Sequence, residues 1–211
     1  MIKTFIIGTG NLSSSLKKKI KNTKICTTNE FLKNIASINK MKKINLIFNS
    51  FYSSAKLNNL ASYKFFVKKT LNDGAKILDL LNPKIINKII YTSSASVYGL
   101  KNVNKNFKDD NNRYIYAAFK FAAEFLIKNY CKKKNIPFII CRIFNLYGGR
   151  DKFSLIYKLK KAIYNNKKIT IYNSGKSMRD FIHIDNVVEI YSLILKKNVT
   201  SGLYDIGTGK G

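Results

Sequence analysis

The chain has few of the residues that build disulfide frameworks and metal sites. Its 211 residues include three cysteines and one histidine. The cysteines are an odd number, lie far apart and lack the spacing of metal ligands, so we expect reduced thiols in the core and no metal site. They are Cys26, Cys131 and Cys141.

Long apolar segments are also missing. No run approaches the ~20 residues that a membrane-spanning helix needs. The N-terminus, MIKTFIIGTG, lacks the long apolar region of a secretion signal and leads straight into a predicted strand. We therefore expect no membrane partner, and the cytoplasm is the expected location.

Acidic residues are scarce, since 11 Asp and Glu oppose 39 Lys and Arg for a net charge of +28. Basic surfaces attract the phosphates of nucleic acids. The lysines, however, are scattered in twos and threes, and no aromatic-and-basic recognition motif is present. We predict that nucleic acid is not a partner, but keep a basic nucleic-acid-binding protein as an alternative.

A chain of this length can bury one core with a small appendage. Apolar runs that indicate strands alternate with patterns that indicate helices, which favours an α/β fold with a parallel sheet covered on both faces. The expected strands are 3–7, 24–27, 43–49, 85–91 and 136–143, and the expected helices are 12–21, 30–41, 60–81 and 115–134.

The pattern changes after Gly149. We expect a helix over 153–164, short strands at 169–172 and 181–184, a helix that Asp185 caps and that runs to about Lys196, and a last strand over 203–206. This predicts a dinucleotide-binding domain over 1–150 and a partial substrate-binding region over 151–211, with elements that return to the first domain.

Hydroxyl side chains follow the apolar run at Tyr91, and a tyrosine and a lysine follow on a predicted helix. Thr92, Ser93 and Ser94 end the strand. Tyr116 and Lys120 are four residues apart, so they share one helix face. A cation beside a phenol can lower the tyrosine pKa by roughly 1–3 units. The sequence therefore predicts a proton-transfer site, although Tyr130 and Lys134 have the same spacing, and such a pair alone is typical of a solvated helix face.

Gly8 and Gly10 end the first strand, and Asn11 and Leu12 open the next helix. Glycines at such a turn let a cofactor pyrophosphate approach backbone N–H groups at a helix N-terminus. Ser13 replaces the last glycine of the usual pattern. After the second strand, Asn29 or Glu30 could bind the adenosine ribose, and the choice between NAD and NADP stays open.

Four ordered motifs carry a resemblance to a known family. They are SASVYG from Ser94 to Gly99, Tyr116-x-x-x-Lys120, CRIFNLYG from Cys141 to Gly148, and GKSMRDFIHIDN from Gly175 to Asn186. Together they resemble the extended short-chain dehydrogenase/reductases, the group of nucleotide-sugar epimerases and dehydratases. The resemblance implies a Rossmann-type doubly wound sheet with a small, incomplete C-terminal substrate-binding part. It also implies a trimmed segment before the third strand and a chain that is shortened at its C-terminus.

The resemblance also implies roles for individual residues. Tyr116 would be the acid/base that exchanges a proton with a sugar hydroxyl, and Lys120 would hold the nicotinamide ribose of NAD or NADP. Ser94 would hydrogen-bond the same substrate oxygen, while Asn145 and Arg179 would contact the substrate's diphosphate. His183 is expected to be structural. A homodimer is expected through helices 60–81 and 115–134. An exposed apolar patch on these helices would mark the interface, and the aromatics that they carry are Phe65, Phe66, Phe119, Phe121 and Phe125.

Two positions in the sequence argue against a dehydratase reaction. The 4,6-dehydratases of the family usually carry an acidic pair where this chain has Ala95 and Ser96. We therefore predict an NAD(P)-dependent nucleotide-sugar epimerase. A nucleotide-sugar 4-ketoreductase and a non-catalytic dinucleotide-binding protein remain alternatives.

Overall fold

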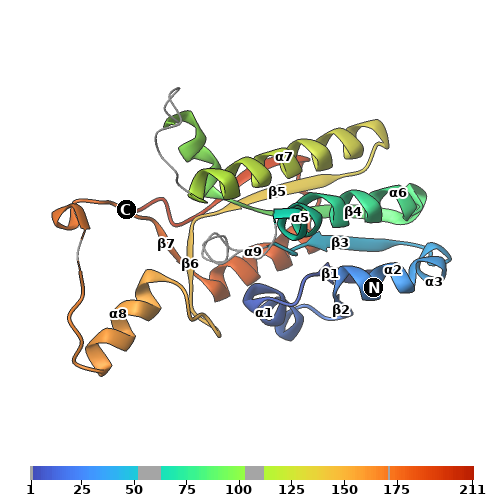
Figure 1. The fold of residues 1–211 in the computed structure, drawn as a ribbon. Coiled ribbons are helices and arrows are strands. Elements are labelled where there is room, and N and C mark those ends of the chain that lie inside the picture. Colours follow the sequence, from blue (N-terminus) through green and yellow to red (C-terminus); the bar gives the residue numbers. More distant parts are fainter. Residues whose placement is uncertain (1, 52–62, 103–111, 171) are drawn as a thin grey trace.

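A six-stranded parallel sheet forms the centre of the protein (Figure 1). The computed structural model describes residues 2–51, 63–102, 112–170 and 172–211. The strands lie in the order β2-β1-β3-β4-β5-β8, and each neighbouring pair is parallel. Their bounds are β1 Lys3–Ile7, β2 Thr23–Cys26, β3 Ile44–Phe48, β4 Ile86–Ser94, β5 Phe138–Ile143 and β8 Gly202–Ile206. The predicted α/β class and Rossmann-type sheet are confirmed.

Helices cover both faces of this sheet because strand side chains alternate between the faces. Ile6, Ile47 and Ile90 pack on one side, under α1 (Asn11–Lys19) and α9 (Ile184–Lys196). On the other side Phe5, Leu46 and Ile89 share a second core with α2 (Thr28–Lys33), α3 (Ile35–Asn39), α6 (Asp73–Leu80) and α7 (Asn112–Lys133).

The register of the strands brings their carboxyl ends to one edge. Ile7 pairs with Phe48, Phe48 with Tyr91, and Tyr91 with Ile140. Residues that follow these four therefore gather at the same edge, where ligands bind in open α/β sheets.

Several helices differ from the prediction. The helix expected over 30–41 is broken at Asn34 into α2 and α3. The part of helix 60–81 within the described residues consists of α5 (Tyr63–Val67), a π-helical turn (Lys68–Asn72) and α6. His183 rather than Asp185 caps α9. A strand was predicted at 169–172, but Ile169 and Thr170 do not form one.

The C-terminal part adds a small second sheet and then returns to the first. β6 (Asn145–Tyr147) pairs in parallel with β7 (Phe181–His183), while α9 and β8 pack with the main sheet. The division at residue 150 stays a prediction. α8 (Leu155–Tyr164) projects from the body and contains no buried residue (Figure 1). Exposed hydrophobic side chains lie on it and just before it in the chain: Phe153, Leu155, Ile163 and Tyr164. Among the helices that the structure describes, none is long and apolar enough to cross a membrane.

Candidate active site

Ser94, Tyr116 and Lys120 line one pocket at the carboxyl edge of the sheet. The pocket measures about 280 Å³. Its wall also includes the start of α1, the ends of β4 and β5, the residues that follow β3 and β5, and one residue of the strand Asn145–Tyr147: Gly10, Asn11, Leu12, Asn49, Phe51, Thr92, Ser93, Ile143, Phe144 and Leu146. The predicted proton-transfer residues and the predicted cofactor turn thus share one pocket.

Tyr116 faces Ser94 across this pocket. A hydrogen bond joins their hydroxyl groups and favours the phenolate, but burial outweighs it and raises the pKa of Tyr116 to about 12. The expected lowering of this pKa by Lys120 is therefore wrong for the protein alone. The physical reason is that taking a phenolate out of water costs more than this one hydrogen bond returns.

Lys120 is almost completely buried, with 3% of its surface exposed. Its Nζ donates to the carbonyl oxygen of Thr92 at 2.7 Å and lies 3.4 Å from the ring centroid of Phe51. Burial holds the pKa of Lys120 well below its usual value, against the opposing effect of Glu124. Its Nζ lies 5.9 Å from the ring centroid of Tyr116, so the two side chains are neighbours as predicted.

Phe51 is a site residue that the sequence did not reveal. Its ring packs edge-on against Tyr116, with centroids 5.4 Å apart, and also lies against the Lys120 ammonium. Cations and aromatic edges both favour such geometry. Its position three residues after the end of a buried strand was the only available signal, because strand ends at this edge line ligand sites.

The glycine turn has the geometry that its residues require. Gly8 has a φ of +120°, and a Cβ there would lie 2.6 Å from the Asn49 carbonyl oxygen, so another residue would not fit. At Gly10, by contrast, a Cβ would meet nothing within 4 Å. Ser13, at the position usually held by a third glycine, is fully buried and accepts a hydrogen bond from the Asn49 amide at 2.6 Å.

The start of α1 is open to a ligand. Gly10 caps the helix without a side-chain hydrogen bond. Asn11 instead bonds the loop after β6, donating to the Gly148 oxygen at 2.9 Å and accepting from the Arg150 N–H at 2.8 Å. Backbone N–H groups in the first turn of a helix bind anions when no side chain caps them.

Asn29 and Glu30 do not line the pocket. The Glu30 carboxylate accepts from the Thr27 N–H at 2.7 Å and from the Thr27 hydroxyl at 3.0 Å, which completes a capping box for α2. The pattern Thr27-x-x-Glu30 is a sequence signature of that motif, so this use of Glu30 could have been recognised. A ribose contact from either residue stays a prediction.

The two predicted diphosphate ligands also lie outside the pocket lining. Asn145 donates from its amide to the Asp180 carbonyl oxygen at 2.7 Å and thereby ties β6 to the segment before β7. Arg179 is exposed. Their contact with a substrate stays a prediction.

His183 has a structural role, as predicted. Its Nδ1 accepts from the Asp185 N–H at 3.3 Å at the start of α9, and its ring packs against Tyr147. Within the described ranges no cluster of His, Cys, Asp and Glu side chains could hold a metal ion.

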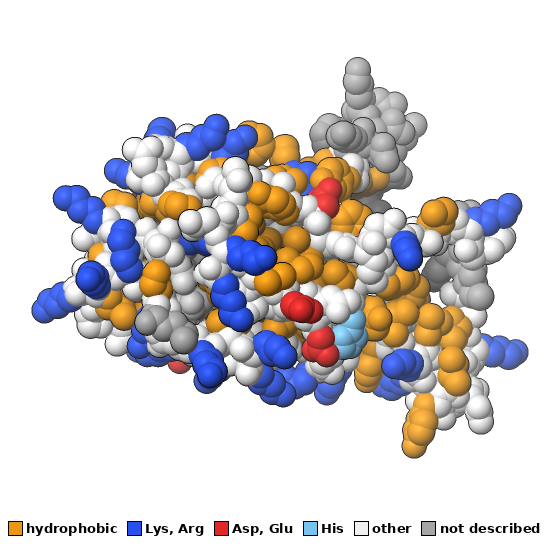
Figure 2. Space-filling view, turned by 180° about the vertical axis from the view of Figure 1, so that it is seen from behind, with side chains coloured by type: hydrophobic (Ala, Val, Ile, Leu, Met, Phe, Trp, Pro, Cys, Tyr) orange, Lys and Arg blue, Asp and Glu red, His pale blue; other side chains and the backbone are white. Residues whose placement is uncertain are grey.

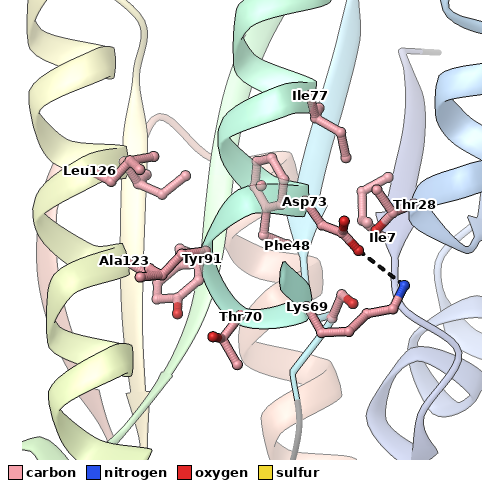
Figure 3. Close-up of a pocket in the computed structure, with 14 residues that line it drawn as sticks. Ile7, Thr28, Phe48, Lys69, Thr70, Asp73, Ile77, Tyr91, Ala123 and Leu126 are labelled. Carbon is pink, nitrogen blue, oxygen red and sulfur yellow. Dashed lines mark hydrogen bonds and ion pairs between the residues drawn. The ribbon is translucent and has the colours of Figure 1, made fainter. Parts of the chain in front are cut away.

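A second pocket lies between the sheet and the helices α6 and α7 (Figure 3). It measures about 30 Å³ and is lined by apolar side chains such as Phe48 and Ile77 around the Lys69–Asp73 ion pair. The Tyr91 hydroxyl, also in its wall, has no hydrogen-bond partner among the described residues. A space of this size holds a water molecule but no nucleotide, so the pocket beside Tyr116 is the candidate active site.

Comparison with known proteins gives curated relatives that match part of the chain. A segment of 139 residues is 35% identical to dTDP-D-glucose 4,6-dehydratase of Dictyostelium discoideum, covering 58% of this chain and 32% of the relative. A segment of 118 residues is 40% identical to Protein CapI of Staphylococcus aureus, covering 53% of this chain and 35% of the relative. The matches thus span about a third of the length of these curated relatives.

Solved structures match almost the whole chain at low identity. UDP-glucose 4-epimerase of Thermotoga maritima, solved with UDP-glucose, superposes with a TM-score of 0.77 at 16% identity, covering 100% of this chain and 78% of that one. UDP-glucuronic acid 4-epimerase of Bacillus cereus, solved with NAD, gives a TM-score of 0.75 at 19% identity, covering 99% and 78%. At such identities the likeness shows the fold alone.

The family model supplies the broader assignment. The model described as the NAD dependent epimerase/dehydratase family matches residues 5–207, which include the glycine turn, the Ser94 strand end and the Tyr116 helix. The chain belongs to the NAD-dependent epimerase/dehydratase family.

Proposed function

We propose that the protein is an NAD(P)-dependent nucleotide-sugar epimerase that works through a keto-sugar intermediate. The observation that carries this proposal is the meeting of Ser94, Tyr116 and Lys120 in one pocket with the uncapped start of α1. A hydroxyl pair and a lysine are the groups that proton transfer at a sugar hydroxyl needs.

The residues of the pocket fit a dinucleotide cofactor. The space beside Gly10 and the uncapped N-terminus of α1 suit a pyrophosphate. An ammonium has three N–H donors, and among the described residues Lys120 has one hydrogen-bond acceptor, Thr92. Two donors therefore remain for ribose hydroxyls. When bound, the nicotinamide supplies hydride transfer.

Around that cofactor the protein positions the sugar and moves its proton. Ser94 and Tyr116 would both hydrogen-bond the sugar oxygen, with Tyr116 taking its proton as the carbonyl forms and returning it afterwards. Since burial raises the pKa of Tyr116 to about 12, the free protein holds the phenol protonated at neutral pH. The positive charge of an oxidised nicotinamide nearby would act in the opposite direction.

Dehydration is disfavoured although curated relatives include 4,6-dehydratases. Removing water from a sugar requires a further acid and base. Ala95 and Ser96 follow Ser94, and neither is a carboxylic acid. The Ser96 hydroxyl is buried and has no hydrogen-bond partner in the described part of the chain. No neighbouring group there would therefore exchange a proton with it, as an acid or base needs.

A nucleotide-sugar 4-ketoreductase is the second candidate, because the same three residues would serve it. An epimerase regenerates its cofactor in each cycle, whereas a ketoreductase consumes reduced cofactor. The test is to incubate the purified chain with a panel of UDP-, dTDP-, GDP- and ADP-sugars. Sugar isomers formed without net change in nicotinamide absorbance would support the epimerase. Net oxidation of added NADH or NADPH would support the ketoreductase, and would also identify which of NAD and NADP is used.

A homodimer is the proposed assembly. Phe65, Phe121 and Phe125 are exposed on the helices expected to pair, and exposed apolar patches of this kind mark interfaces. Two of the aromatics expected there point inward instead: Phe66 is buried, and Phe119 packs against it with ring centroids 5.1 Å apart.

A non-catalytic protein that binds nucleic acid through its charge remains the alternative from another class. Figure 2 shows Lys and Arg side chains scattered over the coloured part of one face rather than gathered in a stripe. That distribution favours solubility and general attraction to anions over a specific groove. A salt-sensitive gel shift with duplex DNA or RNA, in a protein that turns over no nucleotide sugar, would favour this alternative.

A further inference from the structure

A buried ion pair joins the Tyr116 helix to the sheet one turn beyond Lys120. Glu124 lies four residues after Lys120 on α7, with 3% of its surface exposed. Its carboxylate accepts from Arg142 on β5 in a two-pronged contact, at 3.0 Å from Nε and 2.7 Å from Nη2. The Ser93 hydroxyl on β4 donates to the same carboxylate.

The same arginine also holds the segment that follows Ser94. Its guanidinium carbon lies 4.7 Å from the ring centroid of Tyr98. The Tyr98 hydroxyl in turn donates to the Asp205 carboxylate on β8, 2.8 Å from each oxygen. Glu124 and Arg142 therefore bracket Ser94: Ser93 is bound directly before it, and Tyr98 is held four residues after it.

Stability alone gives a weak reason for this arrangement. Taking a carboxylate and a guanidinium out of water costs several kcal/mol for each ion, and well-packed apolar residues often stabilise a protein as much as the buried pair does. What a two-pronged contact does provide is a fixed distance and angle between the elements that carry it. Here these elements are α7, the helix of the acid/base, and β5. β4, the strand that ends at Ser94, is joined to the same carboxylate by the Ser93 hydroxyl.

We infer that Glu124 and Arg142 are positioning residues, which fix the Ser94 hydroxyl opposite Tyr116 and Lys120. Neither side chain lines the pocket, so neither would touch the reacting atoms. The catalytic consequence of this inference rests on the proposed function, but the geometric consequence does not.

The test compares Glu124→Gln with a matched control in the same protein. Asp73 is the control because its side chain is 5% exposed against 4% for Glu124, and it too is held by cations, Lys68 at 2.8 Å and Lys69 at 3.0 Å. It lies on α6 in the small pocket of Figure 3, away from the pocket that holds Tyr116. Asp73→Asn therefore removes a buried, paired carboxylate without touching the link to Ser94.

The first readout needs no substrate. All tyrosines are replaced by 3-fluorotyrosine, and the fluorine resonance of Tyr116 is identified by its loss in Tyr116→Phe. Both carboxylate variants are expected to lower the unfolding temperature, but only Glu124→Gln should move the Tyr116 resonance. An unmoved resonance in Glu124→Gln, or equal movement in both variants, would overturn the positioning role.

The second readout is single-turnover hydride transfer. A misplacement of about 1 Å can cost roughly 10²-fold in rate, so a loss of that order is expected in Glu124→Gln and not in Asp73→Asn. Arg142→Lys keeps the buried charge but loses the two-pronged contact. This variant should therefore fold, with a moved Tyr116 resonance and slower hydride transfer. It takes the place of Glu124→Gln if that variant does not fold. A moved resonance in a protein that is inactive on every nucleotide sugar would refute the proposed function and leave the positioning role standing.

Discussion

The ammonium of Lys120 lies 3.4 Å from the centre of the Phe51 ring. With the Thr92 carbonyl oxygen at 2.7 Å, this contact holds a nearly buried cation in place. A cation on an aromatic face is stabilised by roughly 0.5–2 kcal/mol, which offsets part of the cost of burying it. The ring contact is not a conventional hydrogen bond, so the two N–H donors that Thr92 does not use stay available at the pocket wall.

We predict that Lys120→Met weakens cofactor binding about 10- to 100-fold, because two hydrogen bonds to ribose would be lost, at about 1.4–2.8 kcal/mol together. The apolar stem of the new residue keeps most of the packing, so the protein should stay folded. Titration of NADH or NADPH by fluorescence measures the affinity. Lys133→Met, at an exposed position of the same helix, should bind as the wild type does, and an equal loss in both variants would contradict the role of Lys120.

For catalysis we predict that Tyr116→Phe lowers hydride transfer roughly 10²–10⁴-fold, the range for deleting a positioned acid/base. One oxygen is lost, so stability and cofactor affinity should barely change. The control is Tyr130→Phe, since Tyr130 has the same spacing to a lysine, and its hydroxyl has no hydrogen-bond partner within the described residues. If the two variants turn over an accepted substrate at the same rate, Tyr116 is not the acid/base.

Much of the fold and of the candidate site could be predicted from local spacing in the sequence. Tyr116 and Lys120 share a helix face at any i, i+4 separation, and the strands around them are apolar runs that read clearly. The partners of that helix did not follow from spacing. Arg142 reaches Glu124 only because β5 lies under α7, a contact that depends on sheet order and register.

The direction of the Tyr116 pKa shift also could not be predicted from the sequence. A lysine four residues away predicts a lowered pKa for Tyr116, but the net direction depends on burial, which raises it. Lys120 itself is buried, and the same loss of water disfavours its own charge. The direction of the Tyr116 pKa shift therefore depends on burial, which the helix spacing alone does not reveal.

The two glycines of the turn should respond differently to alanine. At Gly8 a Cβ would lie 2.6 Å from backbone in a residue with φ of +120°, so Gly8→Ala should destabilise the protein by more than 1 kcal/mol, roughly the cost of a strained conformation. At Gly10 the backbone has φ −69°, and the added methyl meets open space. Gly10→Ala should therefore fold normally but bind cofactor more weakly, because the methyl occupies the approach of the pyrophosphate.

Thermal unfolding and NADH titration of both variants separate these effects. Wild-type affinity in a folded Gly10→Ala protein would mean that the cofactor does not approach α1 as proposed.

The proposed dimer should depend on Phe125, which is 56% exposed and packs against Phe121 with ring centroids 4.9 Å apart. We predict that Phe125→Glu shifts the protein from dimer to monomer, because a carboxylate would be buried at the interface without a partner. Light scattering at micromolar concentration measures the mass. Ile163→Glu, at an exposed apolar position on α8, should leave the dimer intact. A monomeric wild type would contradict the assembly.

The three buried thiols should make the protein less stable in alkali. Burial raises the pKa of Cys26 to about 11 and those of Cys131 and Cys141 to about 12, from an ordinary value of 9.0. Above pH 9 the unfolded chain releases these protons while the folded protein keeps them, so the unfolded state binds fewer protons and stability falls as pH rises. At pH 10 the loss is about 1 kcal/mol for each thiol.

Buried lysines act in the opposite direction over part of the same range. Burial lowers the pKa of Lys120 and Lys88, so between their folded pKa and 10.5 the unfolded chain binds more protons and stability rises with pH. Urea unfolding under reducing conditions at pH 7 and pH 10 measures the balance. Cys131→Ala should lose about 1 kcal/mol less than the wild type between the two pH values, and Lys120→Met should lose more than the wild type. If Cys131→Ala loses as much as the wild type, this thiol does not contribute to the alkaline loss of stability.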